Sequence, residues 1–550
     1  MSSVNVCGCQ MCQASWFGGA SPDGASPAPA GSFGGWASYT IQSGTVQGGA
    51  VVRVPDASAV QPAFDDGAQI QSQADSSLIH LDQFRADPRF SGIDGRGLSV
   101  VVIDTGIDLN HSFFGPDANF NGIADRIVYS YDFSGSNDSN ASDTNGHGSN
   151  VASIIGSQDG TYTGMAPGVN IIALKVFPDG PNPRGSDADI SEALNWVVAN
   201  RAAYNIVAVN MSLGSFSNYN SPVTNPYGNQ FATLVANNTA VVVSSGNDYA
   251  SFQSQGVSSP SADPNAWSIG AVWDRNVGAK YFQSGAIDYS TGADRITSFS
   301  QRSPSMTTIF APGGQIGGAN YNGGVVSYSG TSQAAPHIAG LVADMQQLAL
   351  QVSGHFLSVS QLKLDMINGS ATIYDGDDEN DNVANTFASY RRVDALGWGN
   401  QILNDLFAGT TGVDTLNGTA VGDTIRGKNG ADTLNGNGGN DKLFGDSEND
   451  TLNGGAGDDT LDGGTGFDTA VFAGLRSAYQ ITWDPSFVRV VKVGDSDTLY
   501  NIEQLRFSDG LVPVDSLAPP QTIESAGSTR LVKVGNQFFL RDAVGAGPSL

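Results

Sequence analysis

The sequence predicts an α/β unit with a mainly parallel sheet, followed by an all-β unit wound as a parallel β-roll. Two runs, 98–103 and 240–245, are apolar without alternation, as in strands that are covered on both faces. An apolar run with helical spacing follows Ser332. From residue 409 onward glycine and aspartate recur every nine residues, a period typical of stacked repeats. The two patterns do not overlap, so two architectures are expected.

Length and composition predict several domains. The chain has 550 residues, of which 40% are hydrophobic, and this is enough for a large core. The segment 13–60 is rich in Gly, Ser, Ala and Pro and reads as a flexible leader. The expected parts are a leader or propeptide (1–85), an α/β domain (86–400), the roll (401–472), a β-rich cap (473–518) and a tail with a hairpin (519–550).

The net charge limits the partners. With 25 Lys and Arg against 53 Asp and Glu, the formal charge is −28, which argues against nucleic acid and anionic membranes. No stretch of about 20 apolar residues predicts a transmembrane helix, and the N-terminus lacks the profile of a cleaved signal peptide. For Cys7, Cys9 and Cys12, a soft-metal site and a disordered tail both remain open.

Ser332 is the candidate nucleophile. It lies in the block Ser-Gly-Thr-Ser-Gln-Ala-Ala-Pro-His, at the start of a predicted helix whose unpaired N–H groups can hold a negative charge. A serine needs a base, and the base needs a third group that orients it. Of the five histidines, His147 is flanked by glycines and begins a buried run. His80 and His111 are expected at the surface, and His337 in packing.

Two further side chains follow predicted buried strands. Asp104 ends the strand 98–103 and is followed by Thr-Gly, at the edge where open α/β sheets place their sites. Aspartic proteases also use Asp-Thr-Gly, but they need two copies and the chain has one. Asn247 follows the strand 240–245, where its amide can donate to an oxyanion together with backbone N–H groups.

The chain order Asp104, His147, Asn247, Ser332 resembles the subtilisin-like serine proteases, over roughly residues 85–400. The resemblance implies a three-layer α/β fold and a serine endopeptidase that works through an Asp-His-Ser triad and an acyl-enzyme. It also implies that the edge strand lining the substrate cleft is formed by Ser212, Leu213 and Gly214.

Two positions depart from the family pattern. Gln333 stands where a methionine usually follows the nucleophile, and Ser149 replaces the usual threonine after Gly-His-Gly. Neither departure removes a catalytic group, so an active enzyme is expected.

The second strong feature is a ladder of aspartates. Glycine lies five residues before each aspartate, and an aliphatic residue lies two after it. Glycines permit tight turns, carboxylates are hard ligands for Ca²⁺, and the aliphatic side chain points inward from a short strand. A flexible linker would explain the composition but not the phase. The ladder consists of Asp414, Asp423, Asp432, Asp441, Asp450, Asp459 and Asp468.

This ladder resembles the RTX nonapeptide repeats of bacterial type I-secreted proteins. The resemblance implies calcium between consecutive turns, an extracellular protein, and export through type I secretion machinery without a signal peptide. The segment after the repeats resembles the cap of serralysin-type metalloproteases, although no His-Glu-x-x-His motif occurs. Val421 and Glu448 replace pattern glycines, so weaker calcium binding is expected in the second and fifth copies.

A third acidic pattern resembles an EF-hand loop. It has oxygens at positions 1, 3, 5 and 9 and glycine at 6, but Val128 stands where the bidentate glutamate would be. Another acidic turn, 375–381, is equally consistent with an ion site and with a solvated loop. The predicted EF-hand-type ligands are Asp117, Asn119, Asn121, Ile123 and Asp125.

A rival function belongs to another class. A chain with these two parts could instead be a calcium-dependent surface or matrix-binding protein with a degenerate protease fold. The intact set of four site residues argues against that alternative.

Overall fold

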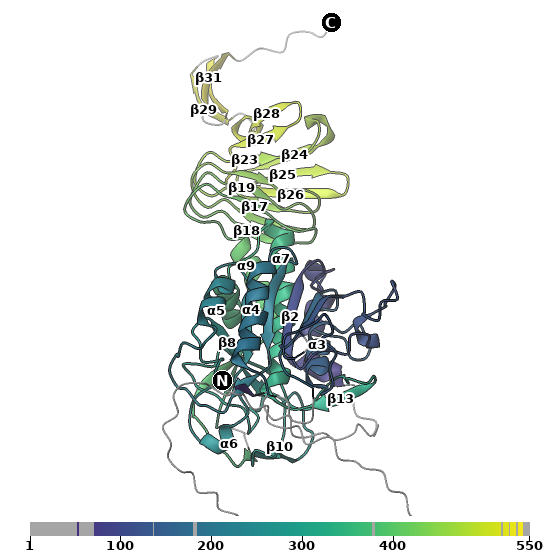
Figure 1. Ribbon diagram of the computed structural model, residues 1–550. Coiled ribbons are helices and arrows are strands. Elements are labelled where there is room, and N and C mark those ends of the chain that lie inside the picture. Colours follow the sequence, from purple (N-terminus) through teal and green to yellow (C-terminus); the bar gives the residue numbers. More distant parts are fainter. Residues whose placement is uncertain are drawn as a thin grey trace, which may run out of the picture.

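Figure 1 shows the computed structural model of the chain. It describes residues 52–53, 71–135, 137–179, 184–376, 380–518, 521–526, 529–534 and 537–542. Cys7, Cys9 and Cys12 lie outside these residues. The α/β part and the β-roll are joined end to end through α9 (Ala395–Leu406).

The α/β part is built on a nine-stranded sheet. All neighbouring strands are parallel except β14 and β16 at one edge. β2 is buried along its whole length, as its uninterrupted apolar sequence predicts. The strand order is β14 (Ala371–Tyr374), β16 (Ser389–Arg392), β11 (Ile309–Pro312), β8 (Ala266–Val272), β7 (Ala240–Ser244), β5 (Ile206–Met211), β2 (Ser99–Asp104), β4 (Asn170–Lys175) and β3 (Ile127–Asp132).

Helices cover both faces of this sheet. Alternate residues of β2 enter different hydrophobic clusters: Val100 and Val102 pack with α3 (His147–Gly156), α7 (Thr331–Ser353), α8 (Val359–Gly369) and α9. Val101 and Ile103 pack on the other side with α4 (Asp187–Asn200) and α5 (Gly228–Val235). The result is the three-layer α/β arrangement that was predicted.

Two short helices ahead of this sheet belong to the same core. They are α1 (Gln71–Leu78) and α2 (Leu81–Ala86). Ile79, Leu81 and Phe84 are fully buried, and Ala395 donates its N–H to the carbonyl of Ile79. Packing of the α/β part therefore begins before residue 86.

Smaller elements lie around the main sheet. Val52–Arg53 forms a short strand, β1, that pairs antiparallel with β6 (Gly214–Ser215). The others are α6 (Tyr249–Phe252), β9 (Lys280–Tyr281), β10 (Ile287–Ser290), β15 (Asn380–Asp381), β12 (Ile316–Ala319) and β13 (Val325–Tyr328).

The repeats fold as a roll of two facing sheets. Each three-residue strand pairs in parallel with the strand 18 residues later, so successive nine-residue copies alternate between the sheets. The strands are β17 (Thr415–Asn417), β19 (Thr433–Asn435), β21 (Thr451–Asn453) and β23 (Thr469–Val471) in one sheet, and β18 (Thr424–Arg426), β20 (Lys442–Phe444) and β22 (Thr460–Asp462) in the other.

A β-rich cap extends both sheets of the roll. Its antiparallel pairs are β24–β25, β25–β26 and β27–β28. The cap strands are β24 (Gln480–Asp484), β25 (Phe487–Lys492), β26 (Asp495–Tyr500), β27 (Gln504–Phe507) and β28 (Gly510–Pro513). Three more antiparallel strands follow: β29 (Gln521–Ala526), β30 (Thr529–Val534) and β31 (Gln537–Asp542). These sheets and the α/β part confirm the predicted fold class.

The roll and the α/β part share one hydrophobic cluster. Phe407, directly after α9, belongs to this cluster together with Ile425 of β18. Main-chain bonds at the same point join Arg426 N–H to the Phe407 carbonyl and Gly409 N–H to the Arg426 carbonyl. The first coil therefore stacks directly on the end of α9.

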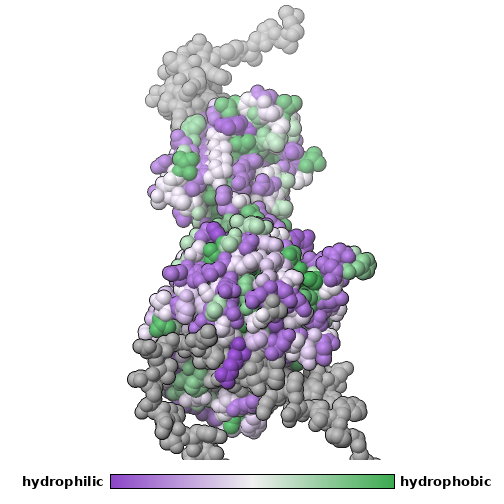
Figure 2. Space-filling model, in the orientation of Figure 1, coloured by the Kyte–Doolittle hydropathy of each residue, from purple (hydrophilic) through white to green (hydrophobic). Residues whose placement is uncertain are grey.

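The surface agrees with the charge of the chain. Among the residues coloured in Figure 2, hydrophilic ones predominate and hydrophobic ones are scattered over the visible face. Within the described residues, no helix combines the length and apolarity needed to cross a membrane.

The stacked aliphatic side chains should decide the stability of the roll. Leu452 is fully buried, whereas Leu416 in the first strand is only partly buried. We predict that Leu452→Ala lowers the free energy of unfolding in calcium buffer by about 2–5 kcal/mol, because it leaves a cavity. Leu416→Ala should lower it less. Urea denaturation of both variants is the measurement, and equal losses would contradict the prediction.

Candidate functional site

The carboxyl ends of the central strands bring two candidate catalytic residues together. Asp104 is the last residue of β2, and His147 is the first residue of α3. His147 Nδ1 lies 2.7 Å from Asp104 Oδ1, and the two residues are only 2% and 1% exposed. A buried carboxylate at this distance fixes the tautomer of the ring and leaves Nε2 available to accept a proton.

Glycines allow this close approach. A Cβ on Gly148 would lie 2.0 Å from the carbonyl oxygen of Gly106, so any other residue would push α3 away from the loop after β2. Gly146 caps the helix with φ +100°, a conformation that glycine adopts readily. The glycines on both sides of His147 are therefore required by the geometry.

Ser332 is the second residue of α7, and it is fully buried. Its Oγ donates to the carbonyl oxygen of Ser212 at 3.4 Å, and the Ser212 hydroxyl donates to the Ser332 carbonyl at 2.8 Å. His147 Nε2 is buried without a hydrogen-bond partner among the described residues. The structure thus joins His147 to Asp104, while the Ser332 hydroxyl is turned toward Ser212.

Asn247 lies beside the start of the same helix. Its Oδ1 accepts hydrogen bonds from Thr331 N–H at 2.9 Å and from the Thr331 hydroxyl at 2.8 Å. Its Nδ2 is buried and has no partner among the described residues. Gly330 leaves room for this amide, because a Cβ there would lie 3.0 Å from Nδ2. An orphaned donor held rigidly next to Ser332 is what oxyanion stabilisation needs.

The predicted substrate edge already carries a strand of the same chain. Arg53 pairs with Gly214 and Val52 with Ser215 in an antiparallel ladder. Leu213 is fully buried in the core, so it anchors the edge from behind. The main chain at Gly214 is therefore able to accept an extended segment.

A carboxylate that the sequence analysis missed joins the loops of Asp104 and His147. Asp143 accepts hydrogen bonds from the Thr105 hydroxyl at 3.0 Å, from the N–H groups of Asn145 and Gly146, and from the hydroxyl and N–H of Ser149. Burial raises the pKa of the Asp143 carboxyl, and these hydrogen bonds act against that rise. The sequence signal that could have identified Asp143 is its position four residues before His147.

The other histidines are not part of this arrangement. His111 is 3% exposed and was wrongly predicted at the surface: its Nδ1 accepts from Phe113 N–H, and its Nε2 lies 3.0 Å from the Gly324 carbonyl. A ring that both accepts and donates in this way is satisfied inside the fold. His80 is partly exposed and pairs with Asp394, and His337 is buried.

In the roll, the aspartates form a hydrogen-bonded ladder. Each donates its N–H to Oδ1 of the aspartate 18 residues later, at 2.7–2.9 Å, from Asp414→Asp432 through Asp450→Asp468. The second oxygen is buried without a partner in five of them: Asp432, Asp441, Asp450, Asp459 and Asp468.

The first two copies differ from the rest. Oδ2 of Asp414 accepts from the N–H and hydroxyl of Thr410, and Oδ2 of Asp423 accepts in the same way from Thr419. These oxygens are therefore already engaged. In the fifth copy, Glu448 adopts a positive φ of 78° at the glycine position, and Asp450 keeps its orphaned oxygen.

The row of buried carboxylates is electrostatically unfavourable by itself. Desolvation, with the charge of neighbouring carboxylates, raises the pKa of Asp441, Asp450 and Asp468 to about 6. Among the described residues, no three His, Cys, Asp or Glu side chains gather closely enough to hold a metal by themselves. Any ion in the roll would therefore need main-chain carbonyl oxygens besides the carboxylates, and both are ligands that Ca²⁺ accepts.

The ladder continues beyond the repeats. Asp459 donates its N–H to Asp497 Oδ1 at 3.0 Å, and Asp468 donates to Glu503 Oε2 at 2.8 Å. The nine-residue spacing missed both acceptors because the β24–β25 hairpin interrupts it. The segment Asp497-Thr498-Leu499 repeats the Asp-Thr-Leu of the earlier copies, and this was the signal for Asp497.

The EF-hand-like loop is exposed and closed by its own hydrogen bonds. Asp117 accepts from the N–H groups of Asn121 and Gly122, and Asp125 accepts from Ala118 N–H and the Asn119 amide. These bonds gather the predicted oxygens around one turn. Calcium binding there stays a prediction.

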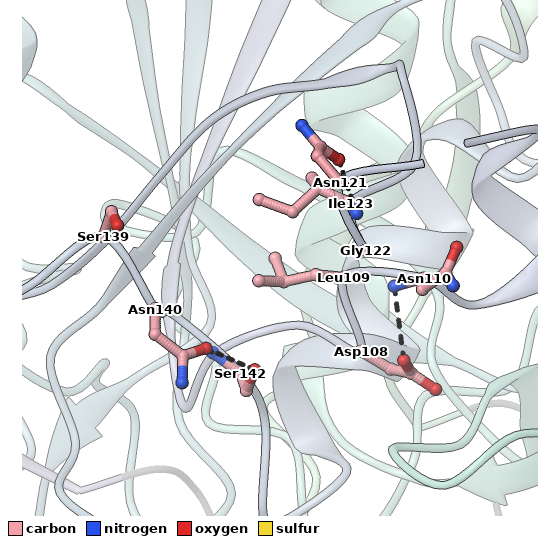
Figure 3. Close-up of a pocket in the computed structure, with 9 residues that line it drawn as sticks. All are labelled: Asp108, Leu109, Asn110, Asn121, Gly122, Ile123, Ser139, Asn140 and Ser142. Atoms are coloured by element: carbon pink, nitrogen blue, oxygen red, sulfur yellow. Dashed lines mark hydrogen bonds between the residues drawn. The ribbon is translucent and has the colours of Figure 1, made fainter. Parts of the chain in front are cut away.

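A polar hollow of about 310 Å³ lies beside this loop. Figure 3 shows Leu109 and Ile123 on one side of it and Asn140 on the other. The polar groups that line it form hydrogen bonds within their own loops; for example, Ile123 N–H donates to Asn121 Oδ1 at 2.9 Å. None of the candidate catalytic residues lines it.

The second acidic turn, 375–381, is only partly described. Asp375 accepts a hydrogen bond from the buried Arg302 at 2.8 Å, whereas 377–379 lie outside the described residues.

Comparison with known proteins places the α/β part. Residues 95–399, more than half of the chain, match the Subtilase family. The chain belongs to the subtilase family. Residues 408–443, 417–452 and 436–470 of this subtilase match the RTX calcium-binding nonapeptide repeat. The resemblances to the subtilisin-like serine proteases and to the RTX repeats are therefore confirmed.

Individual relatives align with the α/β part. Alkaline serine exoprotease A of Vibrio alginolyticus is 31% identical over 276 residues, covering 50% of this chain and 43% of that protein. Proteinase T of Parengyodontium album is 30% identical over 263 residues, covering 47% and 75%. The solved structure of a cold adapted subtilisin-like serine proteinase has 28% identity and a TM-score of 0.40, covering 56% and 91%. The chain spans about half the length of most curated relatives it matches.

The two departures of this subtilase from the family pattern have structural partners. Gln333 Nε2 donates to Asn150 Oδ1 at 3.2 Å, which ties the start of α7 to α3. The Ser149 hydroxyl donates to Asp143 and accepts from Asp108 N–H. Both side chains therefore connect the segments that carry Ser332, His147 and Asp104.

Proposed function

We propose that this subtilase is a secreted, calcium-dependent serine endopeptidase. The observation that carries the proposal is the buried 2.7 Å contact between His147 and Asp104. The helix that begins with His147, α3, packs against α7, whose second residue is Ser332. An orphaned amide, Asn247 Nδ2, adjoins the same helix start. Nucleophile, base, orienting carboxylate and oxyanion donor are the four components of acyl transfer by serine.

The proposed reaction has two halves. Ser332 Oγ turns from the Ser212 carbonyl toward His147 Nε2, gives up its proton to that nitrogen, and attacks the scissile carbonyl carbon. Asp104 stabilises the imidazolium, while Asn247 Nδ2 and the Ser332 N–H hold the oxyanion. His147 then protonates the leaving amine, and water releases the acyl group by the same steps in reverse order.

The substrate would bind as an extended strand. The antiparallel pairing of Val52–Arg53 with Gly214–Ser215 supports this mode, because main-chain hydrogen bonds at this edge do not depend on side chains. Ser212, Leu213 and Gly214 are proposed as the substrate-binding segment. A protein or peptide in an extended conformation is the proposed substrate class.

Calcium is the proposed cofactor of the roll. The five orphaned aspartate oxygens are hard donors that face inward, and they fit a divalent cation. When bound, calcium would offset their charge and link successive coils. The seven ladder aspartates, and the loop ligands Asp117, Asn119, Asn121, Ile123 and Asp125, are the proposed calcium ligands.

Export follows from the same chemistry. A roll that needs calcium would stay unfolded at low intracellular calcium and fold outside the cell, where calcium is millimolar. Signal-peptide-independent export by type I machinery is the proposed route.

The nucleophile is tested by a single substitution. We predict that Ser332→Ala abolishes hydrolysis of casein and labelling by fluorophosphonates, because no other hydroxyl lies at the start of α7 next to Asn247 except that of Thr331, which already bonds to Asn247. Ser329→Ala, three residues earlier, is the control and should keep the label. Turnover that survives in Ser332→Ala would refute the assignment and favour a binding protein.

The oxyanion donor is tested by two substitutions of Asn247 that distinguish its N–H donor from its carbonyl acceptor. We predict that Asn247→Ala lowers kcat by about 10²–10³ with a modest change in KM, the range for one lost donor, for which subtilisin is the reference case. Asn247→Asp keeps the acceptor for Thr331 but loses the N–H donor, so it should be equally impaired. A large rise in KM at unchanged kcat would make Asn247 a substrate-binding residue instead.

Folding of the roll is tested by circular dichroism. We predict that a fragment of residues 400–518 is disordered in EGTA and becomes β-rich in millimolar calcium, because charge repulsion opposes folding until a cation binds. Millimolar magnesium, which dehydrates reluctantly and prefers an octahedral shell, is the control and should have little effect. A spectrum that is already β-rich in EGTA would refute the calcium switch.

A further inference from the structure

Gln301 joins two segments that flank the proposed reaction centre. It lies in the loop between β10 and β11 and is fully buried. Its N–H donates to the Gly246 carbonyl at 2.9 Å, and its carbonyl accepts from the Ser245 hydroxyl at 2.7 Å. These are the two residues directly before Asn247, so the main chain of Gln301 holds the turn that carries the proposed oxyanion donor.

The side chain of Gln301 holds the other segment. Its Nε2 donates to the Ser217 carbonyl at 2.8 Å and to Asn218 Oδ1 at 2.9 Å. Both acceptors follow closely after β6, whose first residue, Gly214, belongs to the proposed substrate edge. One buried residue therefore connects the oxyanion turn with the segment that continues this edge.

The orientation of the Gln301 amide is settled by its acceptors. The carbonyl oxygen of Ser217 can only accept, and the Asn218 amide presents its oxygen because its Nδ2 donates to the Ser254 carbonyl at 3.1 Å. A flipped Gln301 amide would bring oxygen against oxygen. Gln301 Oε1 consequently faces Gly246, and it is buried without a partner among the described residues.

Gly246 leaves the room that this oxygen needs. A Cβ there would lie 2.0 Å from Gln301 Oε1, and the φ of Gly246 is +112°, which glycine adopts readily. An unpaired buried acceptor lowers stability, and an apolar side chain of the same shape would avoid that loss. Stability alone therefore does not explain a glutamine at position 301, whereas a fixed distance between the two segments does.

We propose that Gln301 is a positioning residue, which sets the Asn247 amide at a fixed place relative to a main chain bound along β6. A substrate on this edge would be linked through Ser217 and Gln301 to the turn before Asn247. Oxyanion stabilisation needs a donor that is already in place, and a misplacement of about 1 Å can cost about 10²-fold in rate. This inference rests on the roles proposed for Ser332 and Asn247.

The test is a substitution that keeps the shape of the side chain and removes its donors. On the full-length chain, Gln301→Met should lower kcat for a peptide amide by about 10–100-fold, with a smaller change in KM. Active enzyme is counted by complete fluorophosphonate labelling, so an unfolded fraction does not lower kcat. The matched control is Gln346→Met, about 21 Å along α7 from Ser332. Gln346 is equally buried and its Nε2 donates to the Leu357 carbonyl at 2.9 Å, and its variant should keep kcat.

The Asn247→Ala background identifies how Gln301 acts. If Gln301 acts through the Asn247 amide, Gln301→Met should change kcat by less than about threefold once that amide is absent. Equal losses in both backgrounds, or an unchanged kcat in Gln301→Met alone, would overturn the inference. A full kcat in Asn247→Ala alone would refute the proposed oxyanion role, and this inference with it. If Gln301→Met takes no label, Asn218→Ala, which removes one acceptor of the same amide, decides by the same two comparisons.

Discussion

Compensation of buried carboxylates is the constraint on which both parts of this subtilase depend. Asp104 is removed from water and meets His147 Nδ1 and the Thr105 N–H. Asp143 is equally buried and receives hydrogen bonds from both flanking loops. In the α/β part both oxygens of Asp143 are thus engaged, whereas Asp104 Oδ2 has no partner among the described residues. In the roll, each aspartate receives one main-chain N–H, and an oxygen remains orphaned in five of them. The calcium ions proposed above would supply what the chain does not.

This difference follows from the amount of core that each part can bury. The central sheet is covered on both faces, so the free energy of apolar burial exceeds the loss of conformational entropy. Each nine-residue copy, half of an 18-residue coil, is ordered around one central aliphatic side chain, so apolar burial offsets little of the conformational entropy lost. Burial of Leu434 or Leu443 cannot fold a coil on that balance. We therefore expect the free energy of calcium binding to become folding free energy in the roll.

Sequence reasoning recovered what is encoded in contiguous patterns. Apolar strands, glycine-flanked His147 and the nine-residue ladder gave the fold class and brought Asp104 and His147 together. It failed where partners come from distant segments. The polar sequence neighbours of His111 predicted a surface position, yet its ring is buried and lies 3.0 Å from the Gly324 carbonyl. Asp143 and Asp497 were missed because their roles depend on loops that meet only in three dimensions. The hydroxyl of Ser332, turned toward Ser212, is a rotamer that no sequence pattern specifies.

The junction at Phe407 explains how two folding regimes coexist in one chain. Its side chain lies in the same hydrophobic cluster as Ile425, and its carbonyl accepts from Arg426 N–H. The end of α9 therefore gives the first coil a preformed surface to stack on, which removes part of the entropic loss of starting a roll. In the first two copies Thr410 and Thr419 engage the aspartate oxygens, so these coils depend less on a cation. We therefore expect dependence on calcium to be greater in the later copies, where the second aspartate oxygen has no partner among the described residues.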